Sequence, residues 1–316
     1  MDIRRLHAFV KIVDIGSLTR AAAVLHVAQP ALSQQVLGLE THFNEQLLIR
    51  SKNGVAPTDA GRKLYRHAQI ILRQLEQAEI DISVEADVLA GRVSVGLAPL
   101  SSASSLALLL LQAVRKRYPN IVLVIHENIG GVISEQIMKG KMDIAFIYDP
   151  GDVRGVDVTP LLHEDMFLVA HKSVLSPELQ QSETASVKSV SELNLVLPTP
   201  IHVVRQIVDT TFRRVGVEGK VIAEVEYVPT IASAIWSGLG ATILPLSAAE
   251  ALLKDQEDIV KLKITNPSIQ AKLSLCTSDQ IPLSQPAIAV ANILTKLAHE
   301  FAENHENCGI QRIENA

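Results

Sequence analysis

Three closely spaced helical patterns followed by an Asn-Gly turn constrain the fold of this chain more than any other feature. Apolar residues recur at helical spacing from Leu6 to Val13, and Gly16 ends that pattern. Ser17 then offers a side-chain cap for a second pattern, from Leu18 to Leu25. The short connection between the two patterns predicts a pair of helices that pack against each other.

The third helical pattern begins at Gln29 and Pro30, because proline suits the first turn of a helix. Its predicted core stripe is Leu32, Val36, Leu39 and Phe43. Asn53 and Gly54 then lie between two short apolar runs, which is typical of a β-hairpin. Together these elements predict a winged helix-turn-helix over residues 1–58.

A long helix is expected next, with Thr58 as its cap and Gly91 as its end. Apolar residues recur along it at alternating spacings of four and three, which is typical of a coiled-coil seam. The seam residues are Leu64, Ala68, Ile71, Leu75, Ala78 and Ile82. We expect residues 59–90 to form a dimerising linker; the alternative is a helix that packs on its own domain.

From Arg92 onward strand and helix patterns alternate, which predicts an α/β domain with a parallel sheet. The alternation occurs in two successive sets, so a domain with two lobes and a cleft between them is expected over residues 91–303. Residues 304–316 are predicted to be a loose tail. The expected fold is thus an all-α winged helix-turn-helix with a linker helix, followed by a two-lobed α/β domain of the kind found in periplasmic binding proteins.

The charge is divided unevenly along the 316 residues. Residues 1–66 contain nine Lys and Arg but five Asp and Glu, a net charge of +4, although the whole chain has a formal net charge of -5. A local basic excess of this kind serves to neutralise phosphates, so double-stranded DNA is the expected partner of the N-terminal domain.

Other classes of function lack their signals. The two cysteines, Cys276 and Cys308, have no CxxC partner, and the histidines form no HExxH motif, so we expect no metal site. The Gly238–Gly240 run lacks the third glycine of a dinucleotide fingerprint, so neither a cofactor nor an enzyme activity is expected. The longest apolar run, Leu106–Leu111, is too short for a membrane span, and no signal peptide is recognisable, so a soluble, cytoplasmic protein is expected.

The core stripe of the third helix places a polar face on its opposite side. Gln29, Pro30, Ser33 and Gln34 lie on or beside that face, where short polar groups can reach base edges or phosphates. The alternative is an ordinary solvated helix face. Arg50 and Lys52 on the hairpin just downstream favour a contact with a duplex.

The run AAAVLHVAQPALSQQVLGLETHFNEQLLIR at residues 21–50, followed by GVAPTDAG, resembles the N-terminal signature of LysR-type transcriptional regulators. The later segments GRVSVGLAP, GKMDIAFIYD and SGLGATILP resemble the effector domain of that family, so the resemblance spans most of the chain. Within the family, FVKIVDIGSLTRAA, ALSQQV and LLIRSKNGVAPTDAG are most similar to the nitrogen assimilation control regulators.

The resemblance implies DNA contacts by Gln29, Pro30, Ser33, Gln34 and Arg50. It also implies an interrupted palindromic site, a homodimer or homotetramer, RNA polymerase as a further partner, and action as activator or repressor. The chain departs from the family at two positions. Gln34 replaces an Arg found in many members, which favours readout of adenine. Asn44 replaces the usual Gly after the helix and can adopt the left-handed conformation of that cap.

The resemblance also implies a small-molecule effector in the cleft. Its matching positions are Ser101, Ser102, Asn128, Thr199 and Thr230. Ser101 and Ser102 follow a strand and begin a helix, whose free amides suit a carboxylate ligand. Alternatively these residues only cap helices, and no effector exists. A small-molecule receptor without DNA binding would match the two-lobed half but would leave the first 90 residues unexplained.

Overall fold

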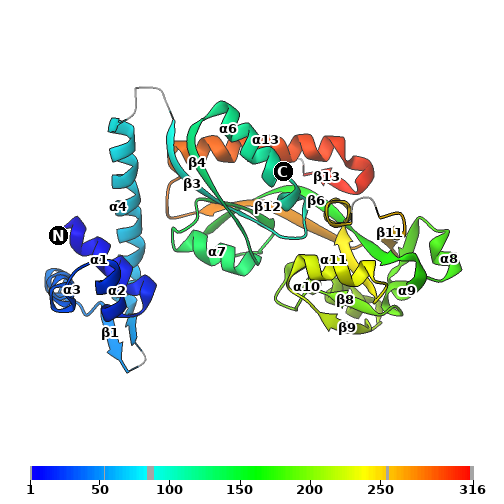
Figure 1. Cartoon of the computed structure of the whole chain (residues 1–316), viewed down its shortest axis with the longest axis horizontal. Coiled ribbons are helices and arrows are strands. Elements are labelled where there is room, and N and C mark those ends of the chain that lie inside the picture. The colour runs from blue at the N-terminus through cyan, green and yellow to red at the C-terminus, as the bar shows by residue number, and fades with distance from the viewer. Residues whose placement is uncertain (1, 53, 84–88, 254–255, 314–316) are drawn as a thin grey trace. The chain divides into compact units, whose positions relative to one another are not determined.

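The computed structural model describes residues 2–52, 54–83, 89–253 and 256–313. The chain forms two compact units, one built from the residues up to Val88 and the other from nearly all of the rest (Figure 1). The first unit has the order helix, helix, helix, hairpin, long helix. Its elements are α1 (Ile3–Ile15), α2 (Leu18–Val24), α3 (Gln29–Phe43), β1 (Leu48–Ser51), β2 (Gly54–Pro57) and α4 (Asp59–Ser83).

Four helix boundaries of the first unit lie where the sequence predicts them. Gly16 ends α1 with a φ of 67°, and the Ser17 hydroxyl accepts from the first turn of α2. Asn44 ends α3 in the left-handed conformation, with a φ of 51°. The Thr58 hydroxyl accepts from the Gly61 N–H at 3.0 Å and so caps α4. These local signals fix the element boundaries before any long-range packing is considered.

The core of the first unit joins α1, α3 and the beginning of α4. Leu32, Val36 and Leu39 of the predicted α3 stripe are fully buried, but Phe43 is exposed because it is the last residue of the helix. Ala68 of α4 is also fully buried in this core. Assigning Ala68 to a dimer seam was therefore wrong, and the alternative of packing on its own domain holds for this part of α4.

The second half of α4 differs from the first. Ile71 is 37% exposed and Ile82 is 87% exposed. The predicted end of the helix at Gly91 is wrong, because α4 is described through Ser83 and Gly91 already belongs to strand β3. The end of the predicted linker, residues 84–88, lies outside the described residues.

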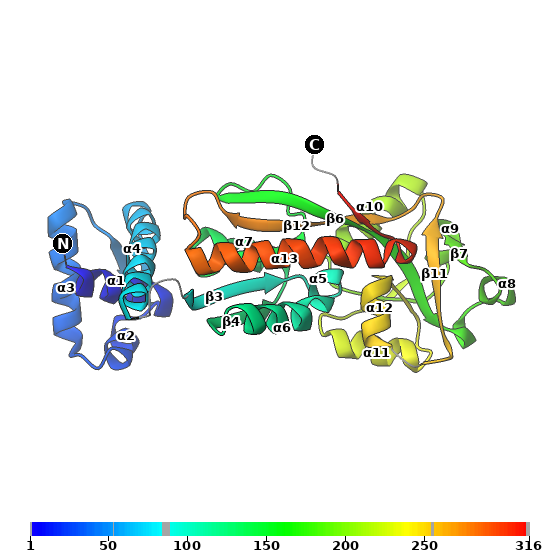
Figure 2. The same ribbon diagram turned by 90° about the horizontal axis from the view of Figure 1, so that it is seen from above.

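The second unit contains one mixed sheet that passes through two lobes. Its strand order is β4-β3-β5-β12-β6-β10-β8-β9. The first lobe contains β3 (Ala90–Leu97), α5 (Ser102–Ser105), α6 (Ala107–Arg117), β4 (Asn120–Glu127), α7 (Gly130–Met138), β5 (Ile144–Tyr148), β12 (Gln270–Ser278), α13 (Gln285–Asn304) and β13 (Ile310–Arg312). Helices α6 and α13 cover one face of its sheet and α7 covers the other (Figure 1), with α13 lying beside β3 (Figure 2).

The second lobe is built on the other end of β6 (Val156–His171). Its elements are α8 (Pro177–Gln180), β7 (Thr184–Ser186), α9 (Val187–Ser191), β8 (Leu195–Leu197), α10 (Val203–Val215), β9 (Val221–Glu224), α11 (Val228–Trp236), β10 (Ala241–Pro245), α12 (Leu246–Leu252) and β11 (Ile259–Thr265). The outer strands of each lobe are parallel, as predicted, but β6 pairs antiparallel with β12, β10 and β11. The sheet is therefore mixed.

The predicted loose tail is wrong for most of its length. Residues Ile310–Arg312 form β13, which pairs antiparallel with β6 from Glu164 to Leu162. A short 3-10 helix, Glu306–Cys308, precedes it. The tail is ordered because it supplies backbone hydrogen bonds to a stretch of β6, a long-range pairing that composition does not indicate.

A buried polar network lies where the two lobes meet. The Glu164 side chain on β6 accepts from the Ser102 N–H at 2.7 Å, and the Tyr148 hydroxyl lies 2.9 Å from its other oxygen. The same hydroxyl lies 3.0 Å from the Leu100 carbonyl oxygen. The Ser102 hydroxyl lies 3.0 Å from that of Ser247 on α12, which links the lobes directly.

With Glu164 ionised, this network would have one hydrogen too few to satisfy all of its acceptors. Tyr148 has one hydroxyl hydrogen for two acceptors, so a proton on Glu164 completes the chain from Glu164 through Tyr148 to Leu100. Burial raises the pKa of the Glu164 carboxyl, in the direction this arrangement needs. The two observations agree that the native state holds this proton more tightly than the unfolded chain does.

Replacing Glu164 therefore gives opposite results with two substitutions. Glu164→Gln reproduces the protonated acid, so we expect a protein at least as stable as the wild type at neutral pH. Glu164→Ala leaves the Ser102 N–H and the Tyr148 hydroxyl without this partner, at a cost of about 2–4 kcal/mol in unfolding free energy. Urea unfolding of both variants measures these effects.

The pH dependence provides a second measurement for the same pair. Because the native pKa of Glu164 is raised, wild-type stability should fall as the pH rises from the unfolded-state value of about 4.3 to the native one, and then level off. Glu164→Gln should lack this component. Parallel stability profiles for the two proteins would contradict a raised pKa at this residue.

Candidate DNA-binding face and interlobe cleft

The N-terminal end of α3 presents four of the predicted contact residues. Gln29, Pro30 and Gln34 are exposed, and Ser33 is half-buried. The Gln29 amide nitrogen donates to the Ser33 hydroxyl oxygen at 3.1 Å. This bond leaves the Ser33 hydroxyl hydrogen free to donate and the Gln29 carbonyl oxygen free to accept, the mixture of groups that recognises base edges.

The backbone at this end of α3 is open to an anion. The N-cap residue is Ala28, and no side-chain cap bond is present. In α2, by contrast, the Ser17 hydroxyl accepts from the Arg20 N–H at 3.4 Å. First-turn N–H groups without a side-chain acceptor, together with the helix dipole, attract a phosphate. Of the two helices that form the motif, only α3 therefore has a first turn without a side-chain cap.

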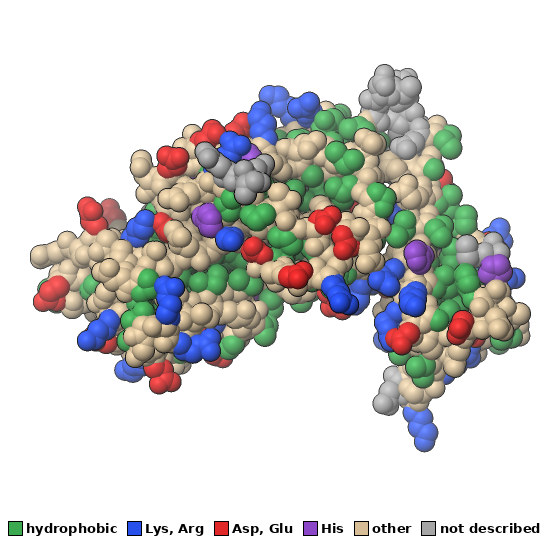
Figure 3. All heavy atoms as spheres, turned by 180° about the vertical axis from the view of Figure 1, so that it is seen from behind, with side chains coloured by type: hydrophobic (Ala, Val, Ile, Leu, Met, Phe, Trp, Pro, Cys, Tyr) green, Lys and Arg blue, Asp and Glu red, His purple; other side chains and the backbone are tan. Residues whose placement is uncertain are grey.

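The wing carries the predicted basic residues. Arg50 pairs with Val55 in the register of β1 and β2, and both Arg50 and Lys52 are exposed. Lys and Arg side chains are visible at the free end of the hairpin in Figure 3. A hairpin with exposed cations at its tip is suited to contact a phosphate backbone.

The Glu40 side chain attaches the wing to the recognition helix. Its Oε1 atom accepts from the Leu47 N–H at 2.9 Å and from the Leu48 N–H at 3.2 Å. Because Glu40 lies on α3, these bonds fix the first strand of the wing relative to that helix. Our sequence predictions missed this residue, since a carboxylate on a helix gives no sign of which backbone amides it will meet.

The other strand of the wing is attached to the α1–α2 turn. The Val55 N–H donates to the Gly16 carbonyl at 2.8 Å. Gly54 has a φ of +123°, and a Cβ there would lie 2.5 Å from the same oxygen. Only glycine fits this position. The wing is thus held at both strands, so its cations and the α3 face keep a fixed relation.

A cleft of about 540 Å³ lies between the two lobes of the second unit. It is lined by residues from the ends of β3, β4 and β9 and from α5, α11 and α12. These are Pro99, Leu100, Ser104, Glu127, Asn128, Ile129, His202, Glu226, Tyr227, Val228, Pro229, Ala248, Ala251 and Leu252. A cleft of this volume is large enough for a small organic molecule.

The predicted effector residues lie at different distances from this cleft. Asn128 lines it. Thr199 is one step removed, since its hydroxyl donates to the lining residue Glu226 at 3.2 Å. Thr230 is exposed on the first turn of α11 but is not among the lining residues. Ser104 lines the cleft in place of the two serines before it.

The prediction that a ligand carboxylate meets the amides at Ser101 and Ser102 needs correction. Both residues are fully buried. The Ser101 hydroxyl accepts from the Ala103 N–H at 3.0 Å, which is the helix-cap alternative. The Ser102 N–H already donates to Glu164, so an internal carboxyl occupies the place that an anionic ligand would take.

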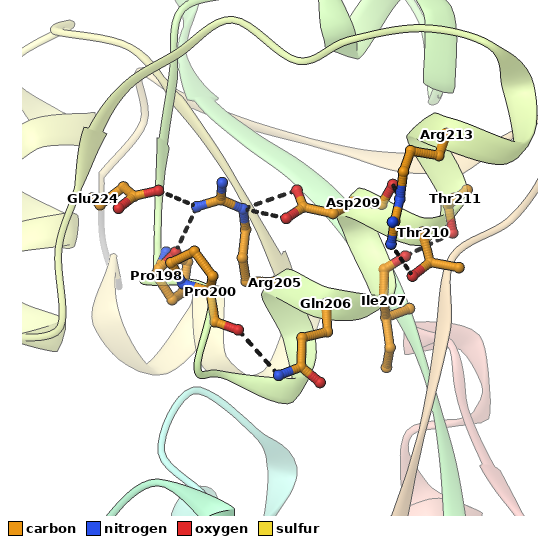
Figure 4. Close-up of polar contacts among 10 residues, drawn as sticks. All are labelled: Pro198, Pro200, Arg205, Gln206, Ile207, Asp209, Thr210, Thr211, Arg213 and Glu224. Atoms are coloured by element: carbon orange, nitrogen blue, oxygen red, sulfur yellow. Dashed lines mark hydrogen bonds and ion pairs between the residues drawn. The ribbon is translucent and has the colours of Figure 1, made fainter.

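Arg205 holds the second-lobe wall of the cleft in place. One of its terminal nitrogens donates to the Pro198 carbonyl at 3.0 Å and to Glu224 at 2.9 Å, while Nε lies 2.9 Å from an Asp209 oxygen (Figure 4). Gln206 adds a bond to the Pro200 carbonyl at 3.0 Å. The loop that leads to His202 and the end of β9 that leads to Glu226 are therefore tied to one guanidinium.

Within the described ranges no cluster of His, Cys, Asp and Glu is arranged to hold a metal ion. The helices of the same ranges include none that is both long and apolar enough to cross a membrane.

Comparisons with known proteins agree with both halves of this structure. Residues 3–62 match the family described as "Bacterial regulatory helix-turn-helix protein, lysR family", and residues 86–298 match "LysR substrate binding domain". The nitrogen assimilation regulatory protein nac of Escherichia coli is 46% identical over 294 residues, which are 93% of this chain and 94% of that protein. The protein of the same name from Klebsiella aerogenes is 43% identical over 97% of this chain and 98% of its own length.

Solved structures share the fold at lower identity. A full-length OxyR variant from Pseudomonas aeruginosa superposes with a TM-score of 0.71 at 22% identity over 94% of each chain. Full-length CbnR in complex with its target DNA gives a TM-score of 0.61 at 22% identity over 94% of this chain and 99% of that one. The two family matches and the nac relatives together show that the chain belongs to the LysR family and is a DNA-binding transcriptional regulator.

Proposed function

We propose that the first turn of α3 reads base edges in the major groove while the wing contacts the backbone, and that the genes so controlled serve nitrogen assimilation. The observation that carries the DNA readout is the open N-terminus of α3, with its exposed Gln and Ser side chains, fixed to a basic wing through Glu40. The two nac relatives support the choice of genes. Mapping the bound DNA across the genome tests that choice.

Leu37 adds an apolar group to the same face. It lies one turn after Gln34 on α3 and is 51% exposed. An exposed leucine on a recognition helix is suited to contact a thymine methyl group. The proposed DNA-contacting face of α3 therefore combines polar contacts to bases near the helix N-terminus with an apolar contact one turn later.

Gln34→Ala should cost about 1–3 kcal/mol at the cognate site and relax the sequence preference there, because a bidentate contact to one base is lost. Fluorescence anisotropy with cognate and single-substituted duplexes measures the loss. His42→Ala is a matched control, since His42 is exposed at the far end of the same helix. Unchanged specificity in Gln34→Ala would mean that this face does not read the bases.

Arg50→Ala should weaken binding to all sequences similarly and reduce the slope of log K against log salt by about one, as expected for one lost phosphate contact. Lys188→Ala removes the same charge from the second unit and should leave the slope unchanged. A loss confined to the cognate sequence would assign Arg50 to base readout instead.

We infer that two copies pair through the second half of α4. Ile71, Leu75, Ala78 and Ile82 keep the heptad spacing; of these Leu75 is half-buried and the other three are exposed. Exposed apolar residues at this spacing on a helix suit a coiled coil with a second copy. Pairing would also place two winged domains on half-sites about one helical turn, or a multiple of it, apart.

Ile82→Glu should convert the oligomer to monomers, because it introduces a charge at an exposed seam position and leaves the core of the first unit intact. Sedimentation velocity measures the mass, and affinity for a palindromic duplex should fall with it. Gln74→Glu adds the same charge to an exposed position on the same helix outside the seam and should stay oligomeric. An unchanged mass for Ile82→Glu would place the dimer interface elsewhere.

We further propose that the interlobe cleft is the effector site and that the protein acts in the cytoplasm. Asn128, predicted from the resemblance, lines the cleft, and Thr199 acts there through Glu226. RNA polymerase stays a predicted partner.

A further inference from the structure

We propose that the interlobe cleft binds an organic cation, a small amine with an apolar body. The inference deepens the proposed function, on which it rests, by naming the class of effector. It is carried by the shape of the cleft, the charges on its walls and the hydrogen-bonding state of the groups around it.

The walls of the cleft are largely apolar. Both lobes contribute these surfaces, which come from Pro99, Leu100, Ile129, Val228 and Leu252. The volume of about 540 Å³ exceeds that of a metal ion or a simple inorganic ion by a wide margin. An occupant that uses this space must therefore present hydrocarbon to the walls.

The fully charged side chains on the lining are carboxylates from opposite lobes. Glu127 ends β4 in the first lobe, and Glu226 follows β9 in the second. Neither Lys nor Arg occurs among the described residues that line the cleft. The Thr199 hydroxyl donates to Glu226 and fixes the position of its carboxylate. A cation between the lobes is thus paired from both sides, whereas an anion would meet two like charges.

His202 adds an acceptor and no charge. Burial lowers the pKa of its imidazole and so favours the neutral ring, although the negative charge of Glu226 acts in the opposite direction. Its Nε2 atom is buried and has no hydrogen-bond partner among the described residues. Because Nε2 is not exposed to the cleft in this structure, an ammonium N–H can reach it only if the ring turns, and the ring must then be the Nδ1–H tautomer.

Two backbone N–H groups near the cleft are already engaged and are not offered to an anion. The Ser102 N–H donates to Glu164, and at the start of α11 the Thr230 N–H donates to the Tyr227 carbonyl at 3.0 Å. Pro229 has no N–H. Tyr227 is among the lining residues, and the face of an aromatic ring attracts a cation.

Three probes of similar shape separate the charge classes: benzylamine, benzyl alcohol and benzoate. Calorimetry on the full-length protein should show binding of benzylamine, at least tenfold weaker binding of the alcohol, and weakest binding of benzoate. Trp236 is the single tryptophan and lies on α11, whose first turn lines the cleft, so its fluorescence gives a second readout. Benzoate binding as tightly as benzylamine, or no binding of benzylamine at millimolar concentration, would overturn the proposal.

Substitutions assign the binding to this cleft. Glu226→Gln and Glu127→Gln should each weaken benzylamine about tenfold, as expected for loss of one close charge pair. Glu183→Gln makes the same change at an exposed position of the second lobe away from the cleft and should have no effect. Benzylamine affinity that is indifferent to both cleft substitutions would also overturn the proposal.

Retention of DNA by all variants, without any probe, is measured in parallel. If the wild-type protein did not retain DNA, the proposed regulator function would be contradicted. The probe series, by contrast, tests only ligand binding in the cleft.

Discussion

The second unit depends on strand β6, which belongs to both of its lobes. Residues Val156–Asp165 pair with β12, and Met166–Ala170 pair with β10, so the sheet passes from one lobe to the other within a single strand. Both backbone N–H groups at the point where β6 changes partners are hydrogen-bonded. The Asp165 N–H donates to the Gly309 carbonyl at 2.7 Å, and the Met166 N–H donates to the Ile269 carbonyl at 2.8 Å. The Glu164 side chain, next to this point on β6, accepts a hydrogen bond from Ser102 and so connects β6 to α5. One short stretch of β6 therefore positions both lobes, and with them the walls of the cleft that lies between the lobes.

The first unit differs from the second because its hydrophobic core is small, while the surface proposed to contact DNA must still be rigid. Side-chain hydrogen bonds made by three residues supplement this core. Glu40 ties α3 to β1, the Thr58 hydroxyl donates to the Gln46 carbonyl at 2.6 Å, and Tyr65 on α4 donates to Asp14 on α1. Burial and the neighbouring Asp14 raise the pKa of Tyr65, so its hydroxyl keeps the proton that this bond requires. A Cβ at Gly61 would overlap the Leu47 carbonyl, so α4 can begin this close to the wing only with glycine there.

Features set by local chemistry could be predicted from the sequence, and features set by distant partners could not. The caps at Ser17 and Thr58, the β1–β2 hairpin and the buried α3 residues needed only neighbouring residues; Asn53 of the predicted turn lies outside the described residues. Ala68 could not be separated from Ile82, because both satisfy the same heptad and only the fold shows that the first meets a core. The tail at Ile310 is ordered by an edge of β6 more than a hundred residues earlier in the chain. Ser102 was placed correctly at a helix start, but its amide meets Glu164, a partner that no spacing rule connects to it.

The contacts and charges between the two lobes explain how a bound cation could change their arrangement. The bond between the Ser102 and Ser247 hydroxyls joins α5 to α12 at 3.0 Å, and both helices also contribute residues to the cleft lining. The lining carries Glu127 and Glu226, one from each lobe, whose like charges oppose a close approach of the walls. A ligand shifts such an equilibrium only if it binds one arrangement more tightly than the other. A cation paired with both carboxylates meets this condition, because it converts their repulsion into attraction only when the walls are near. The apolar remainder of the cleft then adds burial to the same arrangement, so charge and hydrophobic contact favour the same movement.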